Sequence, residues 1–400
     1  MYTELVEKKK WISEDRFLHA LNYCMILPGP EAQQLAIYIG WLLHRTKGGI
    51  AVGLLFVLPS ALILWMLSSI YIIWGHVSCI MAIFDGLKSA VLAIVLLAVI
   101  RIGRRALKNE LMWSVAVLAF VEIFFLKLPF PFIIFSAGVV GFIGNKLFPS
   151  LFQIFKTRGS QQNQAASEEE IVIHTEPSLK RAVRILLACL FLWVAPLFLV
   201  RLFLGSQHVL FQEGVFFSKA ALVTFGGAYS VLPYVSQQAV EHYHWLAPGQ
   251  MLDGLGLAET TPGTLIIVLQ FVGFLGGWKA PAPFVPWVAA ALGSAITTWV
   301  TFLPCFLWVF LGAPYVEQLR GNIKITAVLS CITAAVVGVV LNLALWFGMN
   351  VLFPAGHAPN WWGACVAITA CYGMYRWQWE MITVIGMAGL LRLLHWFVVS

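Results

Sequence analysis

Two short stretches, Leu27-Pro28-Gly29-Pro30 and Thr261-Pro262-Gly263-Thr264, interrupt apolar runs that are otherwise long enough to cross a bilayer. A tryptophan lies the same distance before each stretch, Trp11 before the first and Trp245 before the second. The residues that follow each tryptophan also share a pattern. The chain therefore contains an internal repeat, and the two Pro-Gly pairs mark equivalent positions in its two copies.

A Pro-Gly pair inside a helix removes a backbone donor and permits a sharp turn, so it divides the helix in two. In hydrocarbon such a break is tolerated only where protein or water surrounds it. The half-helix after the break begins with unpaired N–H groups and the positive end of a helix dipole, which suit an anion. Breaks at matching positions of two repeats indicate a transporter's substrate site. A simple kink between packed helices is the alternative, and the duplication favours the site.

The composition is that of a membrane protein. Hydrophobic residues make up 60% of the 400 residues, charged residues 11%, and the mean hydropathy is +0.85. Apolar runs recur along almost the whole chain, so we expect an all-α, polytopic helical membrane protein with about 12 spans. The net charge of +7 fits a positive-inside bias, since the basic residues segregate to one side of this topology. The sequence has no basic stripe interleaved with exposed aromatic residues outside the spans, so we do not expect nucleic-acid binding.

Several kinds of chemistry are not indicated. None of the seven cysteines forms a Cys-x-x-Cys pair, so neither a metal site nor a disulfide framework is expected. The sequence has no phosphate-binding loop of the Walker type and no Gly-x-Ser-x-Gly elbow. An intramembrane enzyme would need a nucleophile–base pair within the spans. We therefore expect neither an enzyme nor a cofactor.

One polar stretch, low in aromatic residues, divides the chain and is predicted to be disordered. It places a first transporter repeat at 1–155, a polar cytoplasmic linker at 156–181, and a connector helix with the second repeat at 182–400. The two broken spans are an odd number of helices apart in this arrangement. The repeats would then have opposite orientations, which is the inverted-repeat geometry of many secondary transporters.

Without a metal, a tetrahedral dianion can be bound by converging N–H groups, hydroxyls, amides and a cation. The candidate substrate-binding residues are Pro28, Gly29, Pro30, Gln33, Gln34, Lys219, Phe225, Gly226, Gly227, Tyr229, Thr260, Thr261, Pro262, Gly263 and Thr264. The Gly226-Gly227 pair permits close approach of an oxyanion or, equally, close helix packing. Tyr229 could donate its hydroxyl or simply pack. Lys219 would either compensate the anion's charge from a buried position or snorkel to an interface.

Ionisable residues inside predicted spans are the other candidates. Glu259 lies three residues before Pro262, inside a predicted membrane span. A charged group at that depth in the membrane is energetically costly, so an ionisable residue there indicates a functional role. Its carboxyl could carry a coupling proton, and pairing with Lys219 or a backbone group is the alternative. Asp85 and Lys88 share a helix face and are expected to form a structural pair.

These residues carry a resemblance to a known family. Leu27-Pro28-Gly29-Pro30 with Gln33-Gln34-Leu35-Ala36, and the run 225–233 with Thr261-Pro262-Gly263, resemble the chromate ion transporter family over nearly the whole chain except the linker. The resemblance implies two homologous halves that move chromate, with coupling to protons, across the bacterial inner membrane. The implied partners are chromate or a sulfate-like oxyanion, protons and the lipid bilayer. Whether the protein forms a homodimer is left open by the sequence.

One departure from the family pattern concerns the first half. In the family, a helix with a Phe-Gly-Gly-Pro motif precedes the tryptophan, and the ten residues before Trp11 do not contain it. A late start codon or a truncated gene would each account for this. Uptake of sulfate or another oxyanion, and a truncated relative that does not transport, are therefore the alternatives to chromate export.

Overall fold

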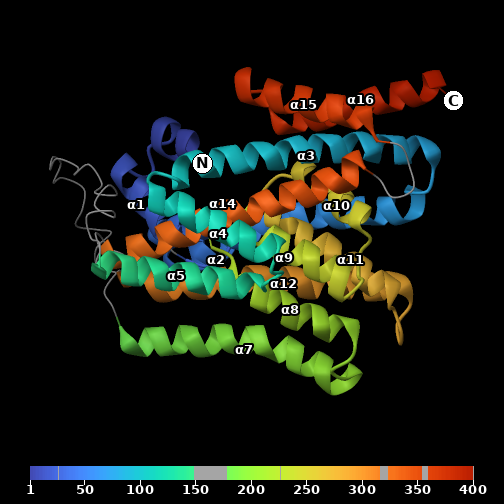
Figure 1. Ribbon diagram of the computed structural model, residues 1–400. Helices are drawn as coiled ribbons and strands as arrows, with labels where there is room; N and C mark the ends of the chain where they lie inside the picture. Colours follow the sequence, from blue (N-terminus) through green and yellow to red (C-terminus); the bar gives the residue numbers. More distant parts are fainter. Residues whose placement is uncertain (26, 148–177, 226, 316–322, 354–358, 400) are drawn as a thin grey trace.

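The computed structural model describes residues 1–25, 27–147, 178–225, 227–315, 323–353 and 359–399, and the elements within these ranges are helices (Figure 1). Gly226 and most of the expected linker, residues 156–177, lie outside them. The elements are η1 (Thr3–Lys8), α1 (Glu14–Cys24), α2 (Glu31–Trp74), α3 (Ser78–Ala106), α4 (Glu110–Phe124), α5 (Phe130–Leu147), α7 (Leu179–Leu204), α8 (Val209–Val223), α9 (Ala228–Gln237), η4 (Gln238–His242), α10 (Pro248–Thr260), η5 (Leu265–Ile267), α11 (Val268–Lys279), α12 (Pro286–Gly312), η6 (Ala313–Tyr315), α14 (Ile323–Leu352), α15 (Trp361–Arg376) and α16 (Met381–Val399).

The element α2 consists of two helices that turn back on one another. His44 and Arg45 have non-helical backbone dihedral angles and form the turn. A Cβ atom at Gly40 would lie 2.7 Å from the carbonyl oxygen of Gly48, so only glycine permits this close approach. The first Pro-Gly pair is thus followed by a short helix and then by a longer one.

The second half repeats this hairpin with α11 and α12. A Cβ atom at Gly273 of α11 would lie 2.7 Å from the carbonyl oxygen of Gly293 of α12. In both halves, therefore, a Pro-Gly pair precedes a helical hairpin whose two arms touch through glycines. The two hairpins also pack against each other, since α2 contacts both α11 and α12.

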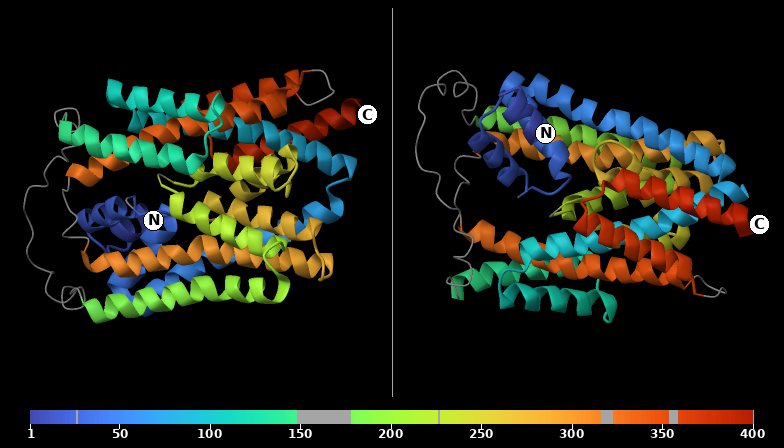
Figure 2. Two further views of the ribbon diagram at one scale, coloured as in Figure 1. Left: turned by 60° about the horizontal axis from the view of Figure 1, so that its bottom comes forward. Right: turned by 90° about the horizontal axis from the view of Figure 1, so that it is seen from above.

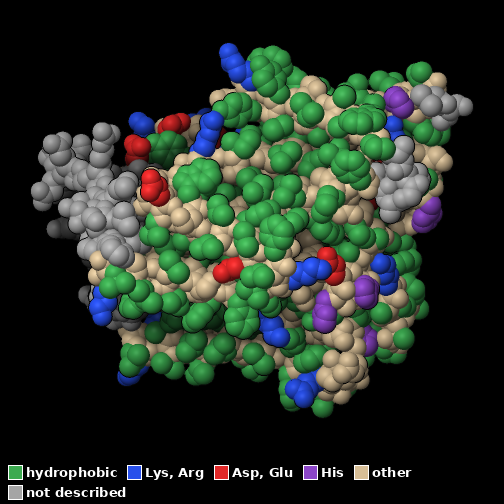
Figure 3. Space-filling view, viewed as in Figure 1, with side chains coloured by type: hydrophobic (Ala, Val, Ile, Leu, Met, Phe, Trp, Pro, Cys, Tyr) green, Lys and Arg blue, Asp and Glu red, His purple; other side chains and the backbone are tan. Residues whose placement is uncertain are grey.

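The surface has the character expected of a protein in lipid. Seven described helices are long and apolar enough to cross a membrane: α2, α3, α5, α7, α12, the described part of α14, and α16. Hydrophobic side chains cover most of the face in Figure 3, and histidines gather toward its right-hand edge. An exposed apolar surface of this extent is stable in hydrocarbon. The chain is therefore a multi-pass helical membrane protein.

The helix α7 lies along the outside of the bundle, on the side opposite α4 in the left view of Figure 2. Cys189 and Trp193 are its buried residues, and it packs on α8 and α12. It begins at Leu179, so the last residues of the expected linker are already helical.

Candidate functional site

The first Pro-Gly break is closed by the protein itself. Gly29 has φ +122° and is buried, and its N–H donates to the carbonyl oxygen of Thr224 at 2.7 Å. The Gln34 side-chain amide donates to the carbonyl oxygen of Pro28 at 2.8 Å. A Cβ atom at Gly29 would lie 2.9 Å from the Cys305 sulfur. The left-handed φ and this crowding both require glycine.

The second break has the same backbone form and a different environment. Gly263 has φ +119°, but Pro262 and Gly263 are exposed. The N–H groups of Gly263 and Thr264 donate no hydrogen bond to any described residue. A cavity of about 370 Å³ lies beside them and is lined by Ala258, Glu259, Thr261, Gly263, Leu265, Glu380, Met381 and Ile382. Gly263 therefore lines the cavity, and its N–H and that of the next residue have no acceptor among the described residues.

Each break packs against the other half of the chain at an equivalent place. The Ser60 hydroxyl, which follows Pro59 in α2, donates to the carbonyl oxygen of Pro262. Cys305, which follows Pro304 in α12, lies against Gly29. Ser60 and Cys305 thus each follow a Leu-Pro pair. In the structure they support the breaks.

A third break, between α8 and α9, joins the other two. Its first residue, Thr224, accepts the hydrogen bond from Gly29. Tyr229, in the first turn of α9, donates its hydroxyl to Glu259 at 2.8 Å. Five residues of extended chain reach at most about 17 Å, so both Pro-Gly breaks lie close to this segment. The three breaks are therefore close together.

The charges around the open cavity are mainly acidic. Glu259 and Glu380 line it, and its lining residues include no lysine or arginine. Arg101, near the end of α3, lies within electrostatic reach of Tyr229. Lys219 is exposed, which favours its snorkelling alternative over a buried role.

The other predicted site residues are placed as follows. The hydroxyls of Thr260 and Thr261 donate to the carbonyl oxygens of Leu257 and Ala258, so they are occupied as donors. Gln33 is fully buried, and its amide has no hydrogen-bond partner among the described residues. Pro30 is the N-cap residue of α2, Phe225 packs on the core, and Gly227, with φ +94°, precedes α9. Gly226 lies outside the described residues.

A partly buried group of charges holds the helix that leads into the open break. The predicted Asp85–Lys88 pair is confirmed, with 3.2 Å between Nζ and Oδ1. Lys88 also lies 3.6 Å from Asp253 of α10, and the Tyr71 hydroxyl donates to Asp253 at 2.9 Å. This network connects α10 to α2 and α3. The sequence analysis missed Asp253, although a lone aspartate within an apolar run was the available signal.

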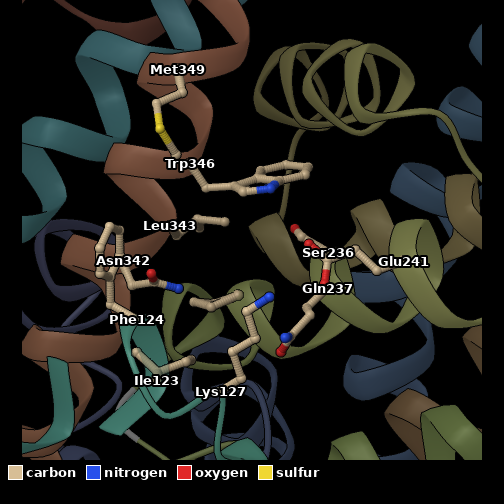
Figure 4. A pocket seen from close by; sticks show the side chains of 11 residues that line it. Ile123, Phe124, Lys127, Ser236, Gln237, Glu241, Asn342, Leu343, Trp346 and Met349 are labelled. Atoms are coloured by element: carbon tan, nitrogen blue, oxygen red, sulfur yellow. The ribbon is translucent and has the colours of Figure 1, made fainter. Parts of the chain in front are cut away.

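A second cavity, of about 280 Å³, lies at the other end of α9 (Figure 4). Its polar groups come from Ser236 and Gln237 at the end of α9, Glu241 of η4, Lys127 of the α4–α5 connection and Asn342 of α14. Its apolar lining comes largely from α4 and from α14, including Trp346. Because Tyr229 and Ser236 are seven residues apart on one helix, about 10 Å of α9 separates this cavity from the open break.

Comparisons with known proteins agree with the resemblance. The family profile described as Chromate transporter matches residues 1–142 and 210–393. A chromate transport protein of Cupriavidus metallidurans is 28% identical over 346 residues, which cover 86% of this chain and 76% of that protein. A chromate transport protein of Pseudomonas aeruginosa is 30% identical over 347 residues, covering 84% and 72%. An uncharacterized transporter of Methanocaldococcus jannaschii is 23% identical over 348 residues, covering 87% and 78%. No solved structure matches the chain.

Proposed function

The chain belongs to the chromate transporter family, which is a transporter and not an enzyme family, and from that premise we propose that it carries chromate across a membrane as a secondary transporter. The observation that supports this best is the meeting of three helix breaks beside a cavity, with two backbone N–H groups unpaired there. Oxyanions bind well to unpaired N–H groups at breaks of this kind.

In the proposed site, the N–H groups of Gly263 and Thr264 bind the oxyanion, and Tyr229 and Arg101 lie nearby. The remaining residues of the predicted set, apart from the exposed Lys219, shape the three breaks around it. Glu259 would repel a dianion while it is charged. A proton on its carboxyl removes that repulsion, so binding of the anion and of the proton are linked. This linkage is the proposed basis of proton coupling.

We propose alternating access between two inverted repeats, 1–155 and 182–400, with about 12 spans in all. The opposed placement of α1 and α10, toward the left and right ends of the bundle in Figure 1, supports this arrangement. So do the reciprocal contacts of Ser60 and Cys305. The cavities at the two ends of α9 would then be the approaches from the two sides of the membrane, the bacterial inner membrane in this proposal.

The test is chromate flux in liposomes that contain the purified protein. We expect radiolabelled chromate to cross the membrane faster than in empty liposomes, and a pH gradient to accelerate it. Protein that is correctly inserted and yet gives the flux of empty liposomes would refute the proposal. Chromate and sulfate share charge and shape, so unlabelled sulfate is the informative competitor. Full competition by sulfate would favour the alternative, a transporter of sulfate or another oxyanion.

A further inference from the structure

A fully buried carboxyl, that of Glu213 in α8, has no role in the site described above. Its exposed fraction is 0%, and neither of its oxygens has a hydrogen-bond partner among the described residues. A Cβ atom at Gly293 would lie 3.0 Å from Glu213 Oε2, and one at Gly276 would overlap Oε1. The carboxyl therefore lies against the backbones of α11 and α12, at the place where these two helices touch.

No described charge compensates Glu213. The helices α7, α9, α11 and α12 pack on α8, and Tyr243 and Trp245, which follow η4, pack on its Phe216. The buried thiol of Cys189 is on α7. The cations of these helices are Lys180, Arg181, Arg184 and Arg201 of α7, Lys219 of α8 and Lys279 of α11, and none of them forms an ion pair with Glu213. The titratable groups of α9 are Tyr229, bonded to Glu259, and Tyr234, which packs on Phe216. The only one on α12 is Cys305.

An uncompensated carboxylate in such a place would cost several kcal/mol, so Glu213 holds a proton in this conformation. A protonated carboxyl is neutral and can be accommodated between glycines. A proton also needs no cavity of its own, unlike a metal ion.

The face of α12 next to Glu213 carries a row of hydroxyls. Ser294, Thr297 and Thr301 follow one another at helical spacing, are buried, and have hydroxyl oxygens without partners among the described residues. Helical hydroxyls ordinarily donate to a carbonyl one turn back, as the neighbouring Thr298 does to Ser294 at 2.8 Å. The hydroxyls of Ser294, Thr297 and Thr301 form no such bond, so they are available as donors and acceptors at the interface between the helices.

The row continues to the first Pro-Gly break. Cys305 is the next residue on the same face of α12, and its sulfur lies 3.9 Å from the Gln34 amide nitrogen. The amide oxygen of Gln34 and the whole amide of Gln33 are likewise buried without described partners. Unpaired buried polar groups thus run from Glu213 to the break that the protein closes.

We propose that Glu213 is a second proton-carrying site of the transporter, and that the hydroxyls of Ser294, Thr297 and Thr301 connect it to the first Pro-Gly break. The inference rests on the proposed function, because it assigns a proton to the same transport cycle. It differs from the role of Glu259, which lies at the open break. Two carboxyls, Glu259 beside the open break and Glu213 connected to the closed break through the hydroxyls, would each bind and release a proton as the two halves alternate.

The experiment compares wild-type protein with Glu213→Gln in liposomes, with Lys219→Gln as the control on the same helix. Two quantities are measured: exchange of labelled for unlabelled chromate, and the protons that move with each chromate, read by a pH dye at zero membrane potential. For Glu213→Gln we expect chromate exchange to persist while the proton count per chromate falls by about one, because an amide does not titrate. Lys219→Gln keeps the wild-type count.

The outcomes separate the two proposals. If the wild type exchanges no chromate, the proposed function fails, and the inference fails with it. If the wild type exchanges chromate and Glu213→Gln keeps its proton count, only the inference is overturned. Should Glu213→Gln not fold, Thr297→Val is measured in its place. Proton movement slowed relative to chromate exchange then supports the hydroxyl row, and wild-type proton movement refutes it.

Discussion

The two Pro-Gly breaks have nearly the same backbone and opposite surroundings. Gly29 and Gly263 have φ values of +122° and +119°, and each lies against the residue that follows a Leu-Pro pair in the other half. Yet the N–H of Gly29 donates to the carbonyl oxygen of Thr224, whereas the N–H of Gly263 has no acceptor among the described residues, and Gly263 lines a cavity. The first break is a structural joint, and the second is free to bind a ligand.

This difference teaches that a repeated motif does not fix a repeated role. A helix break creates unpaired donors in both halves. Whether these donors bind a ligand depends on what else reaches them. At the first break the α8–α9 segment supplies a carbonyl oxygen, whereas at the second Tyr229 of the same segment binds Glu259 and leaves the backbone unpaired.

The largest effect is expected at the helix that leads into the open break. Asp253→Asn removes one of the two carboxylate partners of the partly buried Lys88, together with the acceptor of Tyr71, and should lower the free energy of unfolding by about 2–3 kcal/mol. Thermal unfolding of the purified protein in detergent would measure it. The matched control is the double variant Lys88→Met with Asp253→Leu, which removes both charges and should recover most of the loss. Equal destabilisation of the single and double variants would contradict the pairing.

Substitution of Gly29 and of Gly263 by alanine distinguishes a structural role from a role in binding the anion. Both Gly29→Ala and Gly263→Ala should cost about 1–3 kcal/mol of stability, because alanine disfavours these φ values. For the folded protein, Gly263→Ala should also weaken chromate flux by about 10- to 100-fold, which is the cost of lost hydrogen bonds to a charged group. Flux per folded molecule measures it. Equal flux from the two variants would erase the distinction between the breaks.

Glu259→Gln tests the coupling assigned to the open break. Wild-type chromate flux should rise as the pH falls, because protonation of Glu259 removes the repulsion of the anion. Glu259→Gln should lose this dependence, because an amide does not titrate. At high pH its chromate flux should be about tenfold higher than that of the wild type, equivalent to about 1.4 kcal/mol. Initial rates across a pH series provide the measurement. Both proteins meet the same chromate protonation equilibrium, so a shared pH dependence would assign the effect to the substrate and not to Glu259.

The smallest effect is expected at the closed break. The Tyr23 hydroxyl of α1 donates to the carbonyl oxygen of Trp308 at 3.0 Å, and Phe17, Ala20 and Cys24 of the same helix are buried in an apolar cluster. Tyr23→Phe should therefore cost about 1 kcal/mol of stability with little change in flux per folded molecule. A melting curve and a flux assay on the same preparation would show this. A loss of flux as large as that of Gly263→Ala would mean that the first break also binds substrate.

Local signals in the sequence predicted much of this arrangement. Proline and glycine act on the backbone wherever they occur, so the interruptions at Pro28-Gly29 and Pro262-Gly263 were predictable from the residues alone. The hydropathy of the runs predicted a polytopic helical protein. The spacing of Asp85 and Lys88 predicted their pair. All of these depend on neighbours in sequence.

Contacts between distant segments could not be predicted in this way. The bond from Gly29 to Thr224, the partnership of Lys88 with Asp253 and the burial of Glu213 join residues that only the packed helices bring together. For the same reason, the sequence predicted anion binding at both Pro-Gly breaks alike. Thr260 and Thr261 were expected as anion donors, but whether a hydroxyl bonds its own helix is decided by its rotamer.

The central claim is that the oxyanion binds at the open break and not at the closed one. It is tested most directly by cysteine labelling in a variant without native cysteines that retains flux, with a new cysteine at Leu265 or, as the matched control, at Leu27. Molybdate serves as a tetrahedral dianion that does not oxidise thiols. We predict that it slows maleimide labelling of Leu265→Cys and leaves Leu27→Cys unchanged. Protection of Leu27→Cys alone, or of neither cysteine at concentrations that inhibit chromate flux, would contradict the claim.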